Sequence, residues 1–270
     1  MTISTDGPPG SETTVLRRRT TGTEATRVLG IVTLAGIAWL ILFGLFLSPA
    51  DKNQGESVRI LYLHAPSAWI AYVAFVVTAG TSALYLFRKQ HSLAWDRLAG
   101  ASAEIGVLFM GITLVVGMLW GRLTWGVYWR WDARLTTTAF LFVTYIGYLA
   151  VRRLGGTFEQ RARRSGVLAL LAVLEIPLVH FSVELWRGLH QESSVLRPNG
   201  DVELDGLMLF TLFSGIVTFT LMYVWLVIHR HRALTAEDML DDVGLEAALA
   251  ERRREALTPA GSTASSVAAS

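Results

Sequence analysis

The sequence predicts an all-α integral membrane protein, built as a bundle of six transmembrane helices. Hydrophobic residues make up 52% of the 270-residue chain, charged residues make up only 17%, and the mean hydropathy is +0.42. A spanning helix needs about 20 mainly apolar residues. Six segments meet this requirement, namely residues 28–48, 67–87, 98–120, 135–151, 166–185 and 207–229.

The distribution of positive charge predicts the orientation of this bundle. Seventeen of the 24 Lys and Arg residues fall in the two tails or in the loops 88–97 and 152–165. Because Lys and Arg resist translocation, both termini are expected on the cytoplasmic side of a cytoplasmic (inner) membrane. Segment 28–48 is too long for the apolar part of a signal peptide, so we expect it to be retained.

The same pattern divides the chain into three parts. We expect a disordered cytoplasmic N-tail over residues 1–27, a six-span membrane domain over 28–230 and a cytoplasmic C-tail over 231–270. Both tails are polar or rich in small residues, which is typical of segments that cannot bury a core. The chain has no cysteine, so thiol chemistry, disulfides and thiolate ligands are excluded.

The connection between the third and fourth spans has an unusual composition. It contains the stretch "WGVYWRWDARLT", residues 125–136, on the predicted outer face. If 125–134 is helical, a rotation of about 100° per residue puts Trp125, Tyr128, Trp129 and Asp132 on one face. We therefore expect an amphipathic aromatic helix on the outer membrane surface.

This aromatic cluster has a simple alternative explanation, because Trp and Tyr gather at membrane interfaces as an aromatic belt. A belt does not explain why the rings share one short loop with an aspartate. A large planar apolar ligand with ionised edges explains both. Trp120 and Trp131 extend the cluster on either side.

Three of the six histidines, His64, His180 and His190, fall on the predicted outer side. His180 lies roughly 21 Å up a hydrocarbon core of about 30 Å, at the level of the aromatic segment. His64 and His180 could ligate the iron of a planar macrocycle such as haem from two helices. A zinc site is the alternative, with His190 or Glu184 as a further ligand.

Ionised side chains near these histidines have candidate roles. Arg59 and Arg134 could pair with the two propionates of haem. Glu184 lies one turn from His180 and could orient its imidazole. Glu104 and Glu175 lie within spans, and we interpret both as structural hydrogen-bonding groups.

Three motifs resemble a known family. The stretch "WGRLTWGVYWRWDARLT" resembles the tryptophan-rich motif of the haem-handling membrane proteins of cytochrome c maturation. The stretches "YLHAPSAW" and "VHFSVELWRGLHQ" resemble the two histidine motifs of the haem exporter protein C (CcmC) family. The resemblance covers about residues 28–230.

The resemblance implies a protein that is not itself an enzyme. Such a protein binds haem b at the outer face of the membrane and delivers it to a periplasmic haem chaperone, CcmE. It works beside the ABC-type exporter subunits CcmA and CcmB, one of which supplies the ATPase, and the small subunit CcmD.

The resemblance also implies residue roles. The family's axial histidines correspond to His64 and His180, and its paired arginines to Arg59 and Arg134. Its aromatic platform corresponds to Trp120, Trp125, Tyr128, Trp129, Trp131 and Asp132.

Three other functions compete with this interpretation. A larger synthase that joins haem to apocytochrome would have more spans and longer outer domains. A b-type cytochrome electron-transfer subunit commonly pairs histidines across two or more haems inside the bundle. A plain permease subunit would not need the aromatic cluster.

Overall fold

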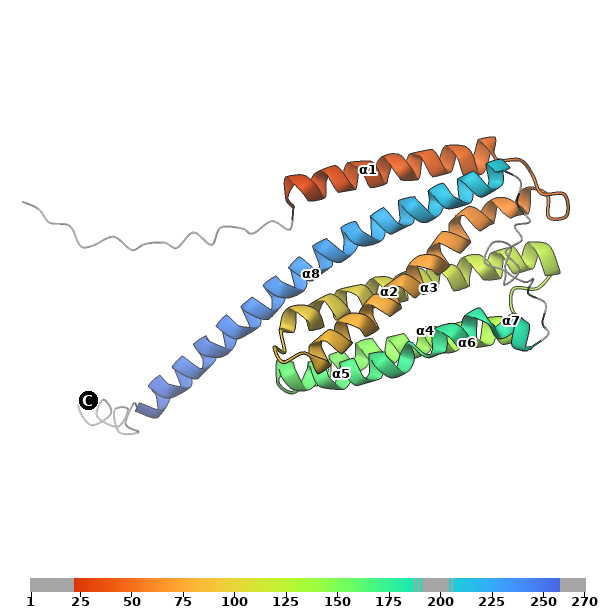
Figure 1. The fold of residues 1–270 in the computed structure, drawn as a ribbon. Helices are drawn as coiled ribbons and strands as arrows, with labels where there is room; N and C mark the ends of the chain where they lie inside the picture. The colour runs from red at the N-terminus through yellow and green to blue at the C-terminus, as the bar shows by residue number, and fades with distance from the viewer. Residues whose placement is uncertain (1–21, 187, 189, 191–203, 205, 258–270) are drawn as a thin grey trace, which may run out of the picture.

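The computed structural model describes residues 22–186, 188, 190, 204 and 206–257. Apart from one isolated β-bridge, every regular element in those residues is helical (Figure 1). The elements in chain order are α1 (Glu24–Ile41), the π-helical η1 (Leu42–Leu47), the 3₁₀ helix η2 (Glu56–Ile60), α2 (Leu61–Phe87), α3 (Leu93–Trp125), α4 (Ala133–Arg152), α5 (Phe158–Ala172), α6 (Glu175–His180), α7 (Ser182–Leu185) and α8 (Gly206–Leu257).

The predicted fold class is confirmed, because the chain is an all-α, multi-pass integral membrane protein. Five helical stretches among the described residues are long and apolar enough to cross a membrane. The remaining predicted span, 166–185, is divided among α5, α6 and α7. Pro177 explains a break here, because it has no N–H to bond to the carbonyl of Val173 four residues earlier.

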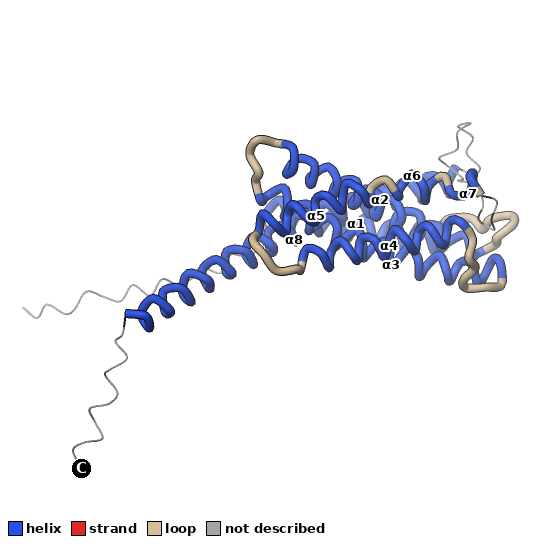
Figure 2. The backbone as a smooth tube through the Cα atoms, turned by 90° about the horizontal axis from the view of Figure 1, so that it is seen from below, coloured by secondary structure: helices blue, strands red, loops and turns tan. Residues whose placement is uncertain are grey.

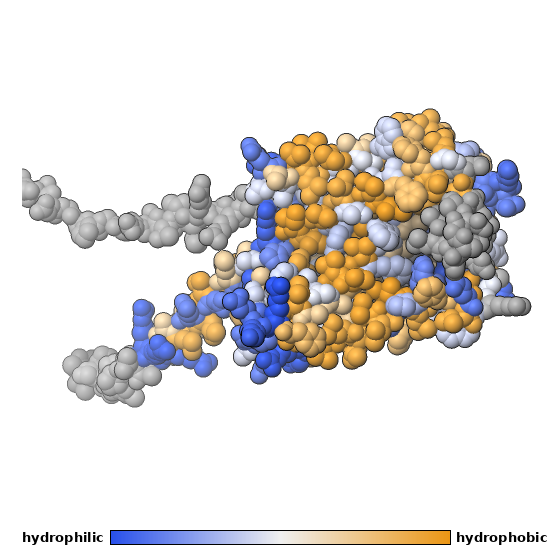
Figure 3. Space-filling view, viewed as in Figure 1, coloured by the Kyte–Doolittle hydropathy of each residue, from blue (hydrophilic) through white to orange (hydrophobic). Residues whose placement is uncertain are grey.

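The helices form a bundle of three pairs (Figure 1). Helices α1 and α8 lie side by side, α2 and α3 form an antiparallel hairpin, and α4 packs against the broken helix α5–α6–α7. Helix α1 begins, and α8 leaves the bundle, at one end, which we call the tail end. The loops 48–55 and 126–132 and the end of α7 lie at the opposite end, which we call the cavity end (Figure 1 and Figure 2). On the face seen in Figure 3, apolar residues cover most of the middle, and hydrophilic ones gather towards the two ends.

Small residues let the central helices approach closely. A Cβ atom on Gly106 of α3 would lie 2.6 Å from Phe75 Cε1 of α2. Phe75 in turn stacks on Tyr145 of α4, with ring centroids 3.5 Å apart. The Ser102 hydroxyl lies 2.7 Å from both the Ala74 carbonyl and the Tyr223 hydroxyl, which ties α3 to α2 and α8. The core is therefore held by close packing and a few hydrogen bonds that are satisfied inside the bundle.

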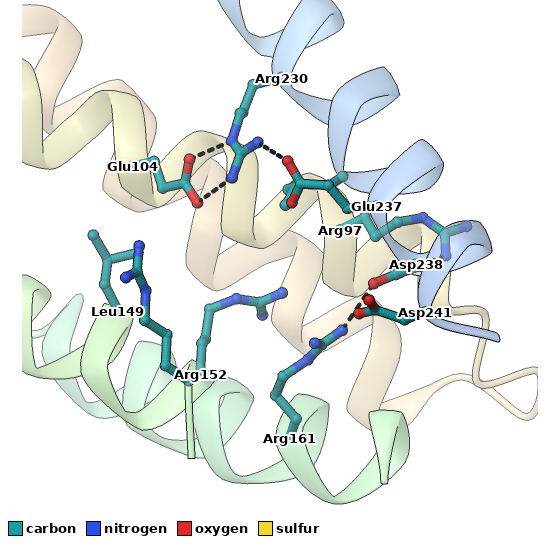
Figure 4. Close-up of a pocket in the computed structure, with 11 residues that line it drawn as sticks. Arg97, Glu104, Leu149, Arg152, Arg161, Arg230, Glu237, Asp238 and Asp241 are labelled. Carbon is teal, nitrogen blue, oxygen red and sulfur yellow. Dashed lines mark hydrogen bonds and ion pairs between the residues drawn. The ribbon is translucent and has the colours of Figure 1, made fainter. Parts of the chain in front are cut away.

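Ion pairs close the tail end (Figure 4). Arg230 of α8 pairs with Glu104 of α3 at 2.5 Å and with Glu237, two turns further along α8, at 2.7 Å. Asp238 of α8 accepts from Arg97 and Arg161 at 3.3 Å each. Glu104, predicted to be a structural group, is thus the acceptor of an interhelical ion pair.

A second ion pair lies deeper at the tail end. Arg152 of α4 donates to both carboxylate oxygens of Asp96 of α3, at 2.5 and 2.9 Å. The exposed fractions of these side chains are 11% and 4%. This bidentate pair joins two helices at a buried position.

The predicted tails differ from the structure where it describes them. Helix α1 begins at Glu24, inside the predicted N-tail, because Thr23 and Thr26 form a capping box there. Helix α8 continues without a break to Leu257, so most of the predicted C-tail extends the last membrane helix. The N-tail expectation for residues 1–21 lies outside the described residues.

The predicted aromatic helix over 125–134 is wrong. Helix α3 ends at Trp125 because Gly126 adopts a left-handed conformation with φ of 76°. Helix α4 begins only at Ala133, where Asp132 is extended and caps the N-terminus by accepting a hydrogen bond from the Leu135 amide. Residues 126–132 therefore form a loop, and its aromatic residues do not share a helical face.

Candidate functional site

A cavity of about 670 Å³ opens at the cavity end, within the range of about 300–1,000 Å³ that is usual for small-molecule sites. Helices α2, α3, α4, α6 and α8 contribute to its walls, and most lining side chains are apolar. The polar lining residues are few, namely Gln54, Thr113, Thr124, Arg134, Thr138 and the histidines at 64, 180 and 190. We call this space the histidine cavity.

His64 projects from the first turns of α2 and depends on a glycine for space. A Cβ atom on Gly117 of α3 would lie 2.9 Å from His64 Cε1. The ring of Trp120, one turn later on α3, stands edge-on to the imidazole, with centroids 5.7 Å apart at 73°. His64 Nδ1 is buried and has no hydrogen-bond partner in the described part of the chain. The neighbouring residues thus confine the His64 imidazole, while its Nδ1 could still bond to a ligand.

His190 is held by hydrogen bonding and by an aromatic contact. Its Nδ1 lies 2.6 Å from Asp132 Oδ2, and its ring stands edge-on to Trp125 at 4.7 Å. Burial lowers the pKa of His190 from its ordinary value, although the Asp132 carboxylate opposes that shift. A neutral imidazole at pH 7 would donate its Nδ1 proton to Asp132, which leaves Nε2 free as an acceptor or metal ligand.

His180 occupies a third position on the cavity wall, at the end of α6. Its ring contacts Phe181 edge-on, with centroids 4.9 Å apart. Its backbone carbonyl, rather than its ring, accepts a hydrogen bond from Arg134 at 2.9 Å. The expected hydrogen bond from the His180 ring to the Glu184 carboxylate is not present among the described residues, where the ring contacts Phe181.

The aromatic residues divide into two groups. Trp120 and Trp125 line the histidine cavity. Tyr128 and Trp131 are 55% and 80% exposed, and they lie on the loop outside the cavity. Trp129 packs edge-on against Trp131 at 5.4 Å, and its buried Nε1 has no hydrogen-bond partner among the residues that the structure describes. The structure therefore places only part of the predicted platform at the cavity.

The predicted arginines also divide. Arg134 lines the histidine cavity. Arg59 instead pairs with Glu56 and donates to the carbonyls of Gly44 and Leu45, at 3.1 and 2.5 Å. Its hydrogen bonds satisfy carbonyls in the π-helical end of the first span. Arg134 is consequently the predicted propionate partner that lies at the cavity itself.

The zinc alternative finds no support in the described residues, where no three His, Asp or Glu side chains cluster as a ligand set. Glu175 has a buried Oε2 atom with no hydrogen-bond partner among the described residues, but it does not line the cavity.

Three residues of the site carried little or no weight in the sequence analysis. His190 entered only as a possible zinc ligand, and Gln54 and Gly117 were not singled out at all. The signal for His190 was present in the quoted motif "VHFSVELWRGLHQ", which contains two histidines. The contacts of Gln54 and Gly117 arise from tertiary packing, which no local pattern indicates.

Comparison with known proteins identifies the family. A sequence model of heme exporter protein C matches residues 14–242. Heme exporter protein C of Bradyrhizobium diazoefficiens is 39% identical over 69% of this chain and 71% of its own length. The protein of the same name from Haemophilus influenzae is 36% identical over 76% and 82%. A ccmC-like mitochondrial protein of cytochrome c biosynthesis from Arabidopsis thaliana is 34% identical over 73% of each chain. The chain belongs to the heme exporter protein C family.

Proposed function

We propose that this protein binds haem in the histidine cavity and delivers it to an extracytoplasmic haem chaperone during cytochrome c biogenesis. The cavity faces the outer side of the cytoplasmic membrane in this proposal, with both termini in the cytoplasm. One observation carries the proposal: three histidines from three separate segments line one mainly apolar cavity together with three tryptophans, Trp69, Trp120 and Trp125. Haem needs this combination of axial nitrogen ligands and apolar walls.

Haem is the cargo in this proposal, and haem b suits the chain because it lacks cysteine. Trp120 and Trp125 would contact the macrocycle, and Arg134 would pair with a propionate. Arg59 remains a propionate candidate only if its hydrogen bonds to the Gly44 and Leu45 carbonyls are exchanged.

His64 is the first proposed axial ligand, and the second is either His180 or His190. Sequence resemblance favours His180. Geometry favours His190, because a metal-binding histidine usually donates its other N–H to a carboxylate, and Asp132 lies 2.6 Å from His190 Nδ1. His190 and Arg134 are also near enough to His64 to interact with it electrostatically. We therefore favour His64 and His190, and retain His180 as the competing ligand.

Delivery requires contact with a soluble partner. The exposed Tyr128 and Trp131 lie on the loop beside the cavity, where a chaperone such as CcmE could reach them. We further propose that the chain acts as a subunit beside CcmA, CcmB and CcmD, without catalytic activity of its own. The exposed aromatic loop is the surface that supports this proposal, because exposed apolar patches commonly mark interaction sites.

The test is a visible spectrum of the purified protein after haem addition, with one histidine replaced at a time. We expect a low-spin bis-histidine spectrum that His64→Ala abolishes. If His190 is the second axial ligand, as the geometry favours, His190→Ala should abolish the spectrum too. If His180 is the second ligand, as the sequence resemblance favours, His180→Ala should do so instead. His91→Ala is the control, because His91 lies at the tail end, where its Nδ1 contacts the Tyr85 carbonyl at 2.7 Å.

Delivery is tested separately by mixing the haem-loaded protein with a purified haem chaperone. Haem should appear on the chaperone as it leaves the membrane protein. A wild-type protein that binds no haem, or loses it equally fast without the chaperone, would contradict the proposal. Redox turnover with a quinol would favour a b-type cytochrome instead.

A further inference from the structure

The segment from Ser48 to Ile60, which we call the strap, crosses the cavity end between η1 and α2. A tight turn shapes its middle. Asp51 Oδ1 accepts hydrogen bonds from the amides of Asn53 and Gln54, at 2.8 and 2.7 Å. The backbones of Asp51 and Gly55 pair with each other at 2.9 and 3.1 Å, and Gly55 has φ of 56°. This Asx-type turn fixes the direction in which Gln54 projects.

Both ends of the strap are fastened to neighbouring helices. At one end, the Ser48 hydroxyl is hydrogen-bonded to the Tyr62 hydroxyl of α2. At the other, Arg59 donates to the carbonyls of Gly44 and Leu45 at the end of the first span. Because hydrogen bonds hold both the turn and the two ends of the strap, the strap can position a side chain over the cavity.

Gln54 is that side chain. It lines the histidine cavity, and its Oε1 accepts a hydrogen bond of 2.9 Å from Trp120 Nε1. An indole N–H can only donate, so the amide oxygen must face it. Trp120 then meets His64 edge-on. The contacts therefore form a chain from the strap through one indole ring to one imidazole.

His64 needs such confinement more than His190 does. Asp132 fixes the ring orientation of His190, whereas His64 Nδ1 has no hydrogen-bond partner among the described residues. Rotation about χ2 of a histidine is broad and only weakly restricted by itself. The walls around His64, which include Trp120, the space at Gly117 and the backbone of Thr113, therefore limit the directions that its ring nitrogens can take.

We propose that Gln54 is a positioning residue of the cavity, which holds the Trp120 indole so that His64 keeps one ring orientation. This inference rests on the proposed function, because the orientation matters as that of a haem ligand. Gln54 acts through Trp120 in this scheme, so Trp120 must be present for Gln54 to have an effect.

The first arm of the test needs no haem. Full-length protein in detergent is treated with diethyl pyrocarbonate, and modification of His64 is followed by peptide mass spectrometry. Gln54→Leu keeps the size of the side chain and removes the acceptor, so His64 modification should rise severalfold. Gln54→Glu keeps an acceptor oxygen and should restore the wild-type rate. Asn53→Ala, beside it in the same turn, is the matched control and should change nothing.

The second arm measures haem loss from the loaded protein to excess apomyoglobin. Gln54→Leu and Trp120→Phe should each speed haem loss about three- to tenfold, and they should broaden the low-spin electron paramagnetic resonance signal. The double variant should lose haem no faster than the faster of the two single variants, because the two residues act on one chain of contacts.

The outcomes separate the two proposals. Wild-type rates of both His64 modification and haem loss in Gln54→Leu would overturn the positioning role. So would additive effects in the double variant. A wild-type protein that takes up no haem would overturn the proposed function, whereas the His64 modification rates would still decide whether Gln54 positions that ring.

Discussion

The two ends of the bundle use polar side chains in opposite ways. At the tail end, arginines and carboxylates from α3, α4, α5 and α8 pair with each other, and a cavity of only about 260 Å³ is left between them (Figure 4). At the cavity end, three histidines and an arginine surround about 670 Å³ of mainly apolar space. The ring nitrogens of these histidines have fewer protein partners than the charged groups of the tail end. His64 Nδ1, for example, has none in the described residues.

The difference indicates where stability and binding are located. A buried charge without a partner costs several kcal/mol, so the paired tail end holds the helices in register. An unsatisfied polar group beside a large cavity costs free energy that a ligand can recover. Even the tail end is not completely satisfied, because Arg97 Nε and Arg161 Nε are buried and have no hydrogen-bond partner in the described part of the chain. Each of these guanidinium groups nevertheless bonds Asp238 through another nitrogen.

The largest expected effect tests the tail end. Arg152→Ala removes the partner of Asp96, which is 4% exposed. An uncompensated buried carboxylate destabilises by about 3–5 kcal/mol, so the thermal unfolding midpoint in detergent should fall strongly. Haem affinity of the protein that remains folded should stay near the wild-type value.

Arg153→Ala is the matched control, because Arg153 is the next residue and is exposed. Its unfolding midpoint should not change measurably. Equal stability of Arg152→Ala and Arg153→Ala would mean that the tail end does not stabilise the bundle.

The next effect tests the cavity end. Trp125 lines the cavity and contacts the His190 ring, whereas Trp131 is 80% exposed on the adjoining loop. Burying an aromatic side chain is worth about 1.5–3 kcal/mol. Trp125→Ala should therefore weaken haem binding about 10- to 100-fold in a titration, and Trp131→Ala should leave it unchanged.

If Trp131→Ala binds haem normally but transfers it to a chaperone more slowly, the two groups of aromatic residues have different roles. The cavity-lining Trp125 would then hold haem, and the exposed Trp131 would act in transfer. If both variants keep wild-type affinity, the tryptophans form an aromatic belt and not a binding wall.

A smaller effect tests how closely the cavity wall fits His64. A methyl group at position 117 would lie 2.9 Å from His64 Cε1, so Gly117→Ala must displace the imidazole. We expect haem affinity to fall about tenfold, with little change in unfolding midpoint. Gly111→Ala on the same helix is the control, because its new methyl would meet Phe142 at an ordinary 3.5 Å. A loss of affinity in both variants would point to damage of α3 as a whole.

Much of the fold was predictable because bilayer thickness sets the length of apolar segments. Five predicted spans correspond to continuous helical stretches, and Pro177 explains the break in the fifth predicted segment, 166–185. The aromatic helix was predicted wrongly because its periodicity was considered without its boundaries. Gly126 ends one helix and Asp132 begins the next, and both signals are local enough to have been recognised.

The site was predictable in its composition but not in its contacts. Residue types and topology indicated His64, Trp120, Trp125 and Arg134, and all four line the cavity. The bond between Asp132 and His190 joins residues 58 positions apart, and that between Gln54 and Trp120 joins residues 66 apart. Such pairs depend on how helices pack, so a single sequence contains no periodic signal for them.

The last and most finely divided effect concerns Asp132, which has a different partner on each carboxylate oxygen. Oδ1 accepts from the Leu135 amide at 2.8 Å and caps α4, while Oδ2 contacts His190. Asp132→Ala removes the cap and should cost about 1 kcal/mol, whereas Asp132→Asn is an equally good cap and should cost little. Asparagine has only one acceptor oxygen, so its NH₂ group would face His190 and favour the tautomer with the proton on Nε2. Both variants should therefore weaken the low-spin haem spectrum, although only Asp132→Ala lowers the unfolding midpoint. A normal spectrum in Asp132→Asn would remove His190 as a ligand and return that position to His180.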